Sequence, residues 1–543
     1  MMTTPLQIQP SFQNQNLSIS LSSSLFYSHT LPFKQNLSVR YIYQRRGTLS
    51  LTCSISKVDN YGTVDFERRP ASKWGVLYKR ISMMKNPELG SASVLNQWEN
   101  EGKPLTKWDL CRIAKELRKY RRHDKALQIY DWINNRPERF RMSASDVAIQ
   151  LDLVSRVHGV SRAEGFFLNL TDDLKEKRTY GALLNAYVHS RSKEKAESLL
   201  EVMRSKKYLT NSLPFNLMMT MYMKLQEYDK VDKLVSEMKE KNIPLDIYTY
   251  NIWLSSCGAQ GSIEKMEQVF EQMSTDPTVI PNWSTFSIMA ALYIKMELFE
   301  KAQASLKKLE SRIIGRDRIP FHFLLSLYGG IGNKDEVYRV WNSYKSRFPS
   351  VPNLGYHAVI SSLVRMDDIE GAEKLYEEWV LVRPSDDSRV GNLLMRWYLT
   401  NGKSDKVLSF FEHMIEGGGG PNSATWELLS EVHVGEKRIS DALLCLEKAF
   451  TTSGSKSWKL KPIKLAAFLK LCQDEDDTDS AEVLIELLRK SGYHEDEAYA
   501  SLISKDDLSS KIERMNDIVD SESMDGDDND ESQVLFNQVD GSF

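Results

Sequence analysis

The residues that most often hold metals or carry catalysis do not form a set in this sequence. A zinc site usually contains cysteines two residues apart, and a zinc deaminase also needs a glutamate two residues after a histidine. Here His494 is followed by Asp496, and the five cysteines lie far apart, at Cys53, Cys111, Cys257, Cys445 and Cys472. We therefore expect no enzymatic activity, no metal and no cofactor, and we interpret the cysteines as small buried side chains.

A glycine run at Gly417–Gly420 is the one segment that resembles a phosphate-binding loop. A phosphate-binding loop needs a lysine followed by serine or threonine directly after its glycines. The run is instead followed by Pro421 and Asn422. We interpret it as a flexible border between two structural units.

The segment from Lys107 to Lys125 has the chemistry to bind phosphate groups. It holds eight basic residues against three acidic ones. Such a cluster attracts a nucleic-acid backbone, although an exposed helix face without a ligand can have the same composition. The candidate phosphate contacts are Arg112, Lys115, Arg118, Lys119, Arg121 and Arg122.

An apolar pattern that recurs about every 35 residues predicts the elements that would position such side chains. Each copy has one small or medium apolar residue, followed by apolar residues four and seven positions later, on the same face of a helix. The small residue recurs because two helices that cross closely leave no room for a long side chain. The ten positions are Ala126, Ala163, Ala196, Val231, Met266, Ala302, Val337, Ala372, Val407 and Ala442.

A second apolar column lies nine residues before the first and marks a preceding helix in each unit. Short polar or glycine-containing turns, such as Ala259–Ser262 and Asn401–Ser404, separate the two helices. A single hairpin of this kind cannot bury both faces, so neighbouring hairpins must stack. We predict an all-α fold, an α-solenoid (superhelix) of about ten tandem helix-turn-helix repeats of ~35 residues, with a long concave surface.

The two ends of the chain differ in composition from the repeated body. Residues 1–58 contain no acidic residue and many serines and threonines, whereas residues 506–540 are rich in aspartate and serine. We predict a disordered transit peptide over 1–53, a pre-repeat helical segment over 54–106 and the repeat array over 107–450. A degenerate helical repeat or cap over 451–504 and an acidic disordered tail over 505–543 follow. Because arginine is absent before Arg40, we favour the plastid stroma, with the mitochondrion as the alternative.

Residues at the repeat borders point to a known family. Pro281-Asn282 and Pro421-Asn422 precede first helices, aspartates such as Asp246 take the equivalent place elsewhere, and a Tyr-Asn pair follows at Tyr250-Asn251. Together with the 35-residue step, these residues make the chain resemble the pentatricopeptide repeat family, in its plant organellar P-class. The resemblance covers about residues 107–450. The tetratricopeptide repeat, which steps by about 34 residues and has a signature missing here, is our second choice.

The resemblance implies that each repeat reads one base of single-stranded RNA with two side chains. These are the fifth residue of the repeat and the last residue at its border. By the family's pattern, Asn216 with Asp246 favours uracil, and Asn251 with Asn282 favours a pyrimidine. Ser287 with Asp317 favours guanine, and Asn392 with Asn422 favours a pyrimidine. Other repeats depart from the pattern, and we expect the carboxylate of Glu427 to repel phosphate.

Two functional hypotheses follow. The first is a monomeric organellar protein that binds single-stranded RNA and acts in RNA stability, processing or translation by occupancy. The second is a helical-repeat scaffold that binds proteins of the ribosome or of an RNA-processing complex. No apolar run in the sequence is long enough to cross a bilayer, so neither hypothesis involves a membrane.

Overall fold

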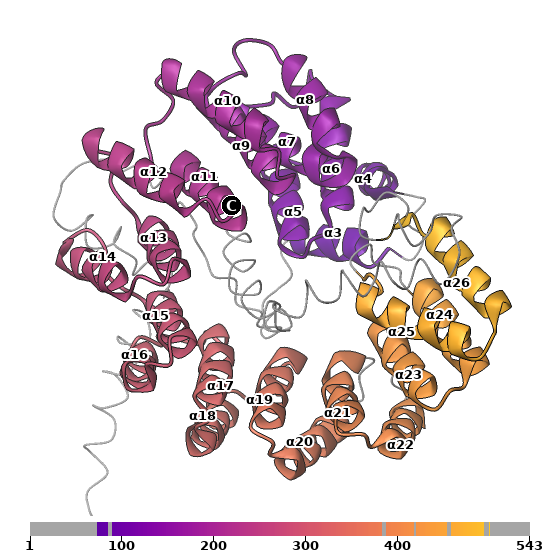
Figure 1. The fold of residues 1–543 in the computed structure, drawn as a ribbon. Helices are drawn as coiled ribbons and strands as arrows, with labels where there is room; N and C mark the ends of the chain where they lie inside the picture. The colour runs from indigo at the N-terminus through magenta and orange to yellow at the C-terminus, as the bar shows by residue number, and fades with distance from the viewer. Residues whose placement is uncertain are drawn as a thin grey trace, which may run out of the picture. The chain divides into compact units, whose positions relative to one another are not determined.

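The computed structural model describes residues 73–84, 90–382, 387–416, 420–452, 458–493 and 499. The predicted transit peptide and acidic tail lie outside these residues. Within them, every regular element is a helix (Figure 1). The helices are α3 (Lys73–Ser82), α4 (Gly90–Asn100), α5 (Lys107–Lys119), α6 (His123–Asn134), α7 (Ala144–His158), α8 (Val160–Leu168), α9 (Lys177–His189), α10 (Lys193–Ser205), α11 (Leu213–Lys224), α12 (Tyr228–Glu240), α13 (Ile247–Ala259), α14 (Ile263–Thr275), α15 (Trp283–Lys295), α16 (Phe299–Ser311), α17 (Ile319–Ile331), α18 (Lys334–Arg347), α19 (Asn353–Arg365), α20 (Ile369–Val382), α21 (Ser388–Thr400), α22 (Ser404–Glu416), α23 (Ser423–Gly435), α24 (Ile439–Thr452), α25 (Pro462–Asp474) and α26 (Thr478–Lys490).

The helices from α5 to α24 form ten consecutive hairpins. Each odd-numbered first helix packs against the even-numbered second helix that follows it, and from α7 onwards each first helix also packs against the first helix of the next hairpin. Helices α3 and α4 precede the array, and α25 and α26 form a further hairpin after it. The predicted all-α solenoid of about ten hairpins is confirmed.

The border residues begin the first helices by capping them. The Asp246 carboxylate accepts a hydrogen bond from the Thr249 backbone N–H at 2.8 Å, and the Asn422 side chain accepts one from the Thr425 N–H at 2.9 Å. Both are capping boxes, because the threonine side chain also bonds to the backbone of the capping residue. The same border residue therefore ends one repeat and fixes the start of the next.

Nine of the ten turns inside the hairpins share one backbone conformation. In these nine, the fourth residue after the second apolar column has positive φ, both where it is glycine, as at Gly261, and where it is not, as at Gln226 and Glu297. The next N–H then bonds back to the carbonyl five residues earlier, for example from Glu227 to Tyr222 at 2.9 Å. This is a Schellman ending; the turn between α7 and α8 differs, because its positive φ falls at Gly159.

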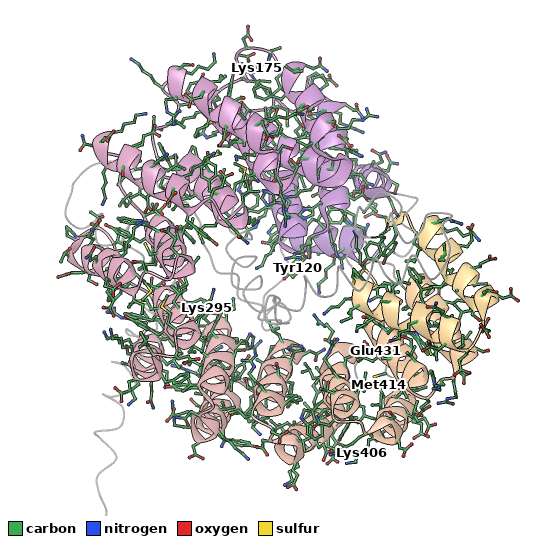
Figure 2. The ribbon with its side chains drawn as sticks, in the orientation of Figure 1. Tyr120, Lys175, Lys295, Lys406, Met414 and Glu431 are labelled. Carbon is green, nitrogen blue, oxygen red and sulfur yellow. The ribbon has the colours of Figure 1, made fainter. Side chains whose placement is uncertain are left out.

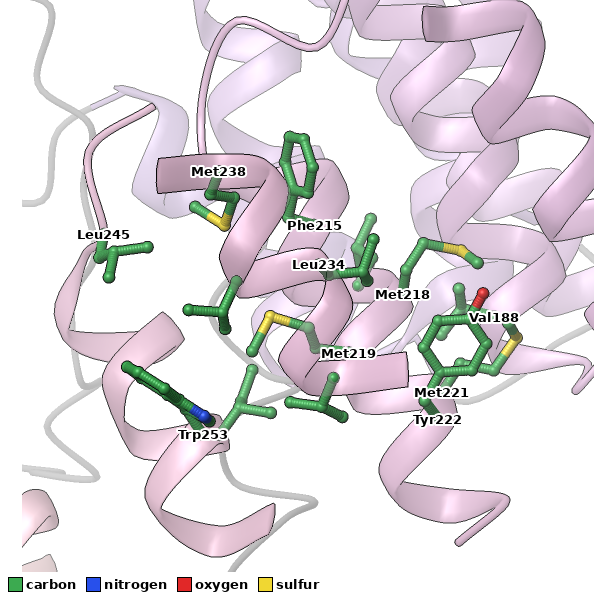
Figure 3. Packing of buried hydrophobic residues seen from close by; sticks show 14 of the residues in the cluster. Val188, Phe215, Met218, Met219, Met221, Tyr222, Leu234, Met238, Leu245 and Trp253 are labelled. Atoms are coloured by element: carbon green, nitrogen blue, oxygen red, sulfur yellow. The ribbon is translucent and has the colours of Figure 1, made fainter. Parts of the chain in front are cut away.

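The ten small residues of the repeat lie at the centre of the core. Each of them is fully buried, at 0% exposure. Figure 3 shows one stretch of this core, where Phe215 and Met219 of α11 lie near Met238 of α12 and Trp253 of α13. Because the buried side chains of one hairpin contact those of the next, the core continues from repeat to repeat.

Consecutive second helices between α8 and α16 are joined by a row of ion pairs, the acid–lysine ladder. In this row the acid directly after the small residue of one repeat pairs with the lysine directly before the small residue of the next. The N–O distances are 2.5 to 2.7 Å, for Glu164–Lys195, Glu197–Lys230, Asp232–Lys265 and Glu267–Lys301. Exposed pairs contribute less than about 1 kcal/mol each, so the ladder fixes register more than it adds stability.

Candidate nucleic-acid interface

Asn216 and Asp246, the predicted base-reading pair of residues 212–246, are hydrogen-bonded to each other in the structure. The Asn216 amide nitrogen on α11 donates to the Asp246 carboxylate at 3.1 Å, and the Thr249 hydroxyl donates to the Asn216 carbonyl oxygen at 2.8 Å. Asn216 is 5% exposed. The amide is therefore held in one orientation by the cap of the following helix.

The pair in residues 388–422 has the same geometry, five repeats later. The Asn392 amide nitrogen donates to the Asn422 side-chain oxygen at 3.1 Å, and the Thr425 hydroxyl donates to the Asn392 oxygen at 2.9 Å. Thr425 corresponds to Thr249 in the earlier repeat. The same three kinds of residue thus form the same hydrogen bonds in two separate repeats.

The other two predicted pairs are not in direct contact. Asn251 donates to the Ser284 hydroxyl at 3.2 Å, and that hydroxyl donates to Asn282 at 2.7 Å, so Ser284 bridges the pair. The Ser287 hydroxyl instead donates to the Ser284 carbonyl of its own helix at 2.8 Å.

Asp317, the border partner of Ser287, makes separate contacts. Its carboxylate accepts the Ile319 N–H at 3.0 Å, and burial raises the pKa of Asp317. The structure thus joins two of the four pairs directly and one through Ser284, and it leaves Ser287 and Asp317 without a mutual hydrogen bond.

Glu427 occupies the fifth position of its repeat, and its carboxylate is buried and paired. It is 6% exposed, lies 2.5 Å from the Lys464 ammonium of α25, and accepts the Trp458 indole N–H at 2.7 Å. Lys464 lies equally close to Glu431, so two carboxylates share one ammonium, and repulsion of phosphate by Glu427 stays a prediction. The sequence pattern could not reveal the pair, because Lys464 comes from the hairpin that follows the array.

The six candidate phosphate contacts divide into residues that support the fold and residues that face outward. Arg118 pairs with the buried Asp152 at 2.8 Å, and Arg122 donates to the Ser82 hydroxyl at 2.8 Å. Lys115 and Arg121 are exposed, as is Arg112, while Lys119 is half-buried. A phosphate role for any of these residues stays a prediction.

A basic column along the first helices was missed in the sequence. It lies two residues after the second apolar column, at the C-terminal ends of six first helices. Figure 2 labels one member, Lys295, at the end of α15. The column comprises Lys119, Arg156, His189, Lys224, Lys295 and Arg365, and all but Lys119 are exposed. Extending the 35-residue register by two positions would have found it, and its lysines and arginines, present in five of the ten first helices, suit the charge of a phosphate backbone.

Four exposed apolar side chains share one position in their repeats. This position lies near the start of the first helix, nine residues before the last buried residue of that helix. Leu213 is 38% exposed and stands three residues before Asn216. Side chains of this kind can lie against the face of a base. The members are Trp108, Leu213, Leu354 and Ile463.

Comparisons with known proteins identify the family. A model described as PPR repeat matches residues 178–208, 248–276, 356–381 and 392–419, and one described as PPR repeat family matches residues 210–259. A pentatricopeptide repeat-containing protein of Arabidopsis thaliana is 54% identical over 500 residues, which cover 92% of this chain and 95% of the relative. The chain belongs to the pentatricopeptide repeat family.

Two further relatives from Arabidopsis thaliana carry more specific names. A mitochondrial pentatricopeptide repeat-containing protein is 34% identical over 462 residues, covering 83% of this chain and 91% of that one. The large ribosomal subunit protein mL101 is 33% identical over 416 residues, covering 76% of this chain and 84% of that one. Among solved structures, the pentatricopeptide repeat protein PPR10 from maize matches with a TM-score of 0.42 and 18% identity, over 77% of this chain and 58% of that chain.

The described part of this pentatricopeptide repeat chain also bears on metal binding and membrane insertion. It contains no group of three or more histidine, cysteine, aspartate or glutamate side chains placed to hold a metal ion. None of its helices combines the length and the apolar character that crossing a bilayer requires.

Proposed function

We propose that this chain is an organellar protein that binds single-stranded RNA with base preference. Pentatricopeptide repeat proteins bind RNA, and we infer that this one acts in RNA stability, processing or translation by occupying its target without turnover. The observation that carries the proposal is the recurrence, five repeats apart, of the same side-chain arrangement at Asn216–Asp246 and Asn392–Asn422.

The chemistry of this arrangement suits the edge of a base. A side-chain amide has two N–H donors and two acceptor lone pairs. At Asn216, one donor goes to Asp246 and one lone pair accepts from Thr249, so one donor and one lone pair remain for a ligand. Because Asn216 is nearly buried, a mismatched base would leave a polar group without a partner, at a cost of about 1–3 kcal/mol.

A substitution that changes the preferred base, rather than abolishing binding, tests the proposal. We expect Asn216→Ser, with Asp246 unchanged, to change the preferred base at one position of the RNA from uracil to guanine. Selection from a randomised RNA pool, followed by sequencing of the bound fraction, measures that preference. Asn342→Ser makes the same chemical change on the exposed surface of α18 and should leave every position unchanged.

An Asn216→Ser protein that selects the same RNA as the wild type would refute base recognition by this pair. A protein that selects no RNA sequence at all would refute the proposed function.

A scaffold function is the alternative. One relative is named as a large ribosomal subunit protein, and large apolar side chains near the repeat borders are exposed, with Ile314 at 84% and Leu381 at 85%. A scaffold of this kind would sediment with organellar ribosomes after nuclease treatment, and Asn216→Ser would not change its partners. An RNA-binding protein should instead be released when its RNA is digested.

We place the protein in an organelle. Relatives over most of its length carry mitochondrial names, and the acid-free segment over residues 1–53 has the composition of a transit peptide. The plastid stroma remains our prediction for the compartment, with the mitochondrion as the alternative.

A further inference from the structure

In two repeats, the third residue of a first helix bonds to the fifth residue of the repeat before it. Thr249 of α13 donates to Asn216 Oδ1 at 2.8 Å, and Thr425 of α23 donates to Asn392 Oδ1 at 2.9 Å. Both threonines are fully buried, at 0% exposure. Each hydroxyl is therefore available to the neighbouring repeat and not to solvent.

The same contact is made near the two ends of the array by residues of different chemistry. The third residue of α7, Asp146, accepts from the Cys111 thiol at 3.5 Å. The third residue of α25, Lys464, lies with its ammonium 2.5 Å from the Glu427 carboxylate. Cys111 and Glu427 are the fifth residues of their own first helices. A donor thus faces an acceptor in all four contacts, although the side chains differ.

Where the third residue has no hydrogen-bonding side chain, the fifth residue bonds elsewhere. Phe321 takes the third place on α17, and Ser287 donates to a backbone carbonyl of its own helix at 2.8 Å. Gly355 takes that place on α19, and Nε2 of His322 is hydrogen-bonded to the Tyr344 hydroxyl at 2.9 Å. The partner of the fifth residue therefore varies with the chemistry of the third residue in the next repeat.

The threonine hydroxyl fixes the amide that would meet a base. At Asn216, Nδ2 donates to Asp246 and Oδ1 accepts from Thr249, so the amide is held at both of its polar atoms. The Thr249 hydroxyl also lies 2.9 Å from the Asp246 carboxylate and links the two members of the pair. Rotation about χ2 of an asparagine is otherwise soft, so an amide held at one atom can turn and move its donor and its acceptor. Since cytosine carries a donor where uracil carries an acceptor, a fixed amide distinguishes them better than a mobile one.

We propose that Thr249 and Thr425 determine how sharply the repeats before them discriminate between bases, because each fixes the orientation of the amide at the fifth position. The inference rests on the proposed function and adds a third residue to each pair that reads a base. Both threonines are positioning residues, since each holds the amide while being fully buried itself.

The experiment measures base discrimination at two nucleotides of one RNA, with the full chain. The RNA is the sequence that the wild type selects from a randomised pool, and Asn216→Ser identifies the nucleotide bound by Asn216. One set of four synthetic RNAs differs only at that nucleotide, and a second set differs only five positions further 3′, at the nucleotide assigned to Asn392. Fluorescence anisotropy gives each Kd, and base discrimination is the ratio of the highest to the lowest Kd in a set. Thermal melting checks that each variant is folded.

Three variants separate the hydroxyl from the rest of the side chain. Valine has the shape of threonine without the hydroxyl, and serine keeps the hydroxyl. We expect Thr249→Val to reduce base discrimination at the first nucleotide by about 3- to 10-fold, the effect of one hydrogen bond, and to leave the second nucleotide unchanged. Thr425→Val should do the reverse, and Thr249→Ser should keep the wild-type ratio at both nucleotides.

Thr285 provides a matched control in an intervening repeat. It is also the third residue of its first helix and fully buried, but its hydroxyl lies 3.5 Å from Asn282, while Asn251 is bonded to Ser284. Thr285→Val should therefore leave base discrimination as in the wild type in both sets, and also in a third set of RNAs that differ at the nucleotide assigned to Asn251. A loss there as large as that in Thr249→Val would overturn the inference.

Equal base discrimination in Thr249→Val and the wild type would overturn the inference and leave the proposed function standing. An equal loss of affinity for all four RNAs of a set, with their ratio unchanged, would also overturn it, because that is the effect of a threonine that only supports the fold. If Thr249→Val does not fold, Thr425→Val makes the same test in a separate repeat. If the wild type selects no RNA, or binds all RNAs of every set equally, the proposed function fails and the inference fails with it.

Discussion

Adding one methyl group at Gly329 should push two neighbouring repeats apart. A Cβ atom at this position of α17 would stand 2.6 Å from the Cβ and 3.2 Å from the Cα of Ser362 on α19. Since these atoms cannot rotate away, the two first helices must separate by about 1 Å to restore ordinary contact. The Ser362 hydroxyl, which contacts the Leu325 carbonyl of α17 at 3.0 Å and the Ala358 carbonyl of its own helix at 2.8 Å, would then keep only the second contact.

The size of the effect follows from two contributions. Overpacking costs about 1–3 kcal/mol, whereas alanine favours the helix over glycine by about 1 kcal/mol. We therefore expect Gly329→Ala to lower the local free energy of unfolding by up to about 2 kcal/mol. Gly165→Ala is the matched control, because nothing lies within 4 Å of the added atom, and it should be neutral or stabilising by up to about 1 kcal/mol.

Hydrogen exchange is the suitable assay because a repeat array can open locally without unfolding throughout. Amides of α17 to α20 should lose protection in Gly329→Ala, while those of α7 to α10 remain as in the wild type. If the α17 and α19 amides in Gly329→Ala are protected as strongly as in the wild type, the close approach of these helices does not exist in solution.

Three further predictions concern pH, salt and targeting. Hydrogen bonds from Lys301 and Tyr293 hold the pKa of Glu267 below its ordinary 4.5, so the stability from this group is present above pH 4.5 and is lost as pH falls through the lowered pKa. Glu267→Gln should therefore show a smaller loss of melting temperature on acidification than the wild type, and an equal loss would contradict the role of the ladder. Replacing Lys224 and Lys295 with alanine should reduce the slope of log affinity for RNA against log salt by about 1 per residue, whereas an unchanged slope would remove the basic column from the phosphate path. Residues 1–53 fused to a fluorescent protein should direct it to plastids; mitochondrial fluorescence would select the alternative, and cytosolic fluorescence would refute a targeting function.

The sequence allowed the architecture to be predicted because helix packing leaves a periodic trace. All ten small residues picked out by spacing, such as Ala126 and Val407, are fully buried in the structure. The border residues Asp246 and Asn422 were also recognised as caps, since a cap is decided within four residues of the chain. Properties of this kind depend on local sequence and need no knowledge of the neighbouring hairpin.

The candidate site was less predictable, because its details depend on contacts between side chains of adjacent hairpins. Asn216 and Asn251 occupy the same repeat position, but only Asn216 bonds directly to its border partner, while Ser284 intervenes at Asn251. The ion pair between Glu427 and Lys464 likewise joins residues 37 positions apart that no local rule connects. The partner of each side chain depends on which residues the next hairpin places opposite it, and periodicity alone does not determine that.

The acid–lysine ladder has a direction along the chain, and this restricts how such a protein can change in length. Each hairpin in the ladder gives its carboxylate to the hairpin after it and its ammonium to the hairpin before it. Removing or duplicating one complete unit brings a carboxylate back opposite an ammonium. A cut through the middle of a unit shifts the register instead, so that the carboxylate no longer lies opposite an ammonium. Growth and shrinkage by whole hairpins within the ladder thus preserve its ion pairs, so a unit between α8 and α16 can be gained or lost without redesign of this outer surface.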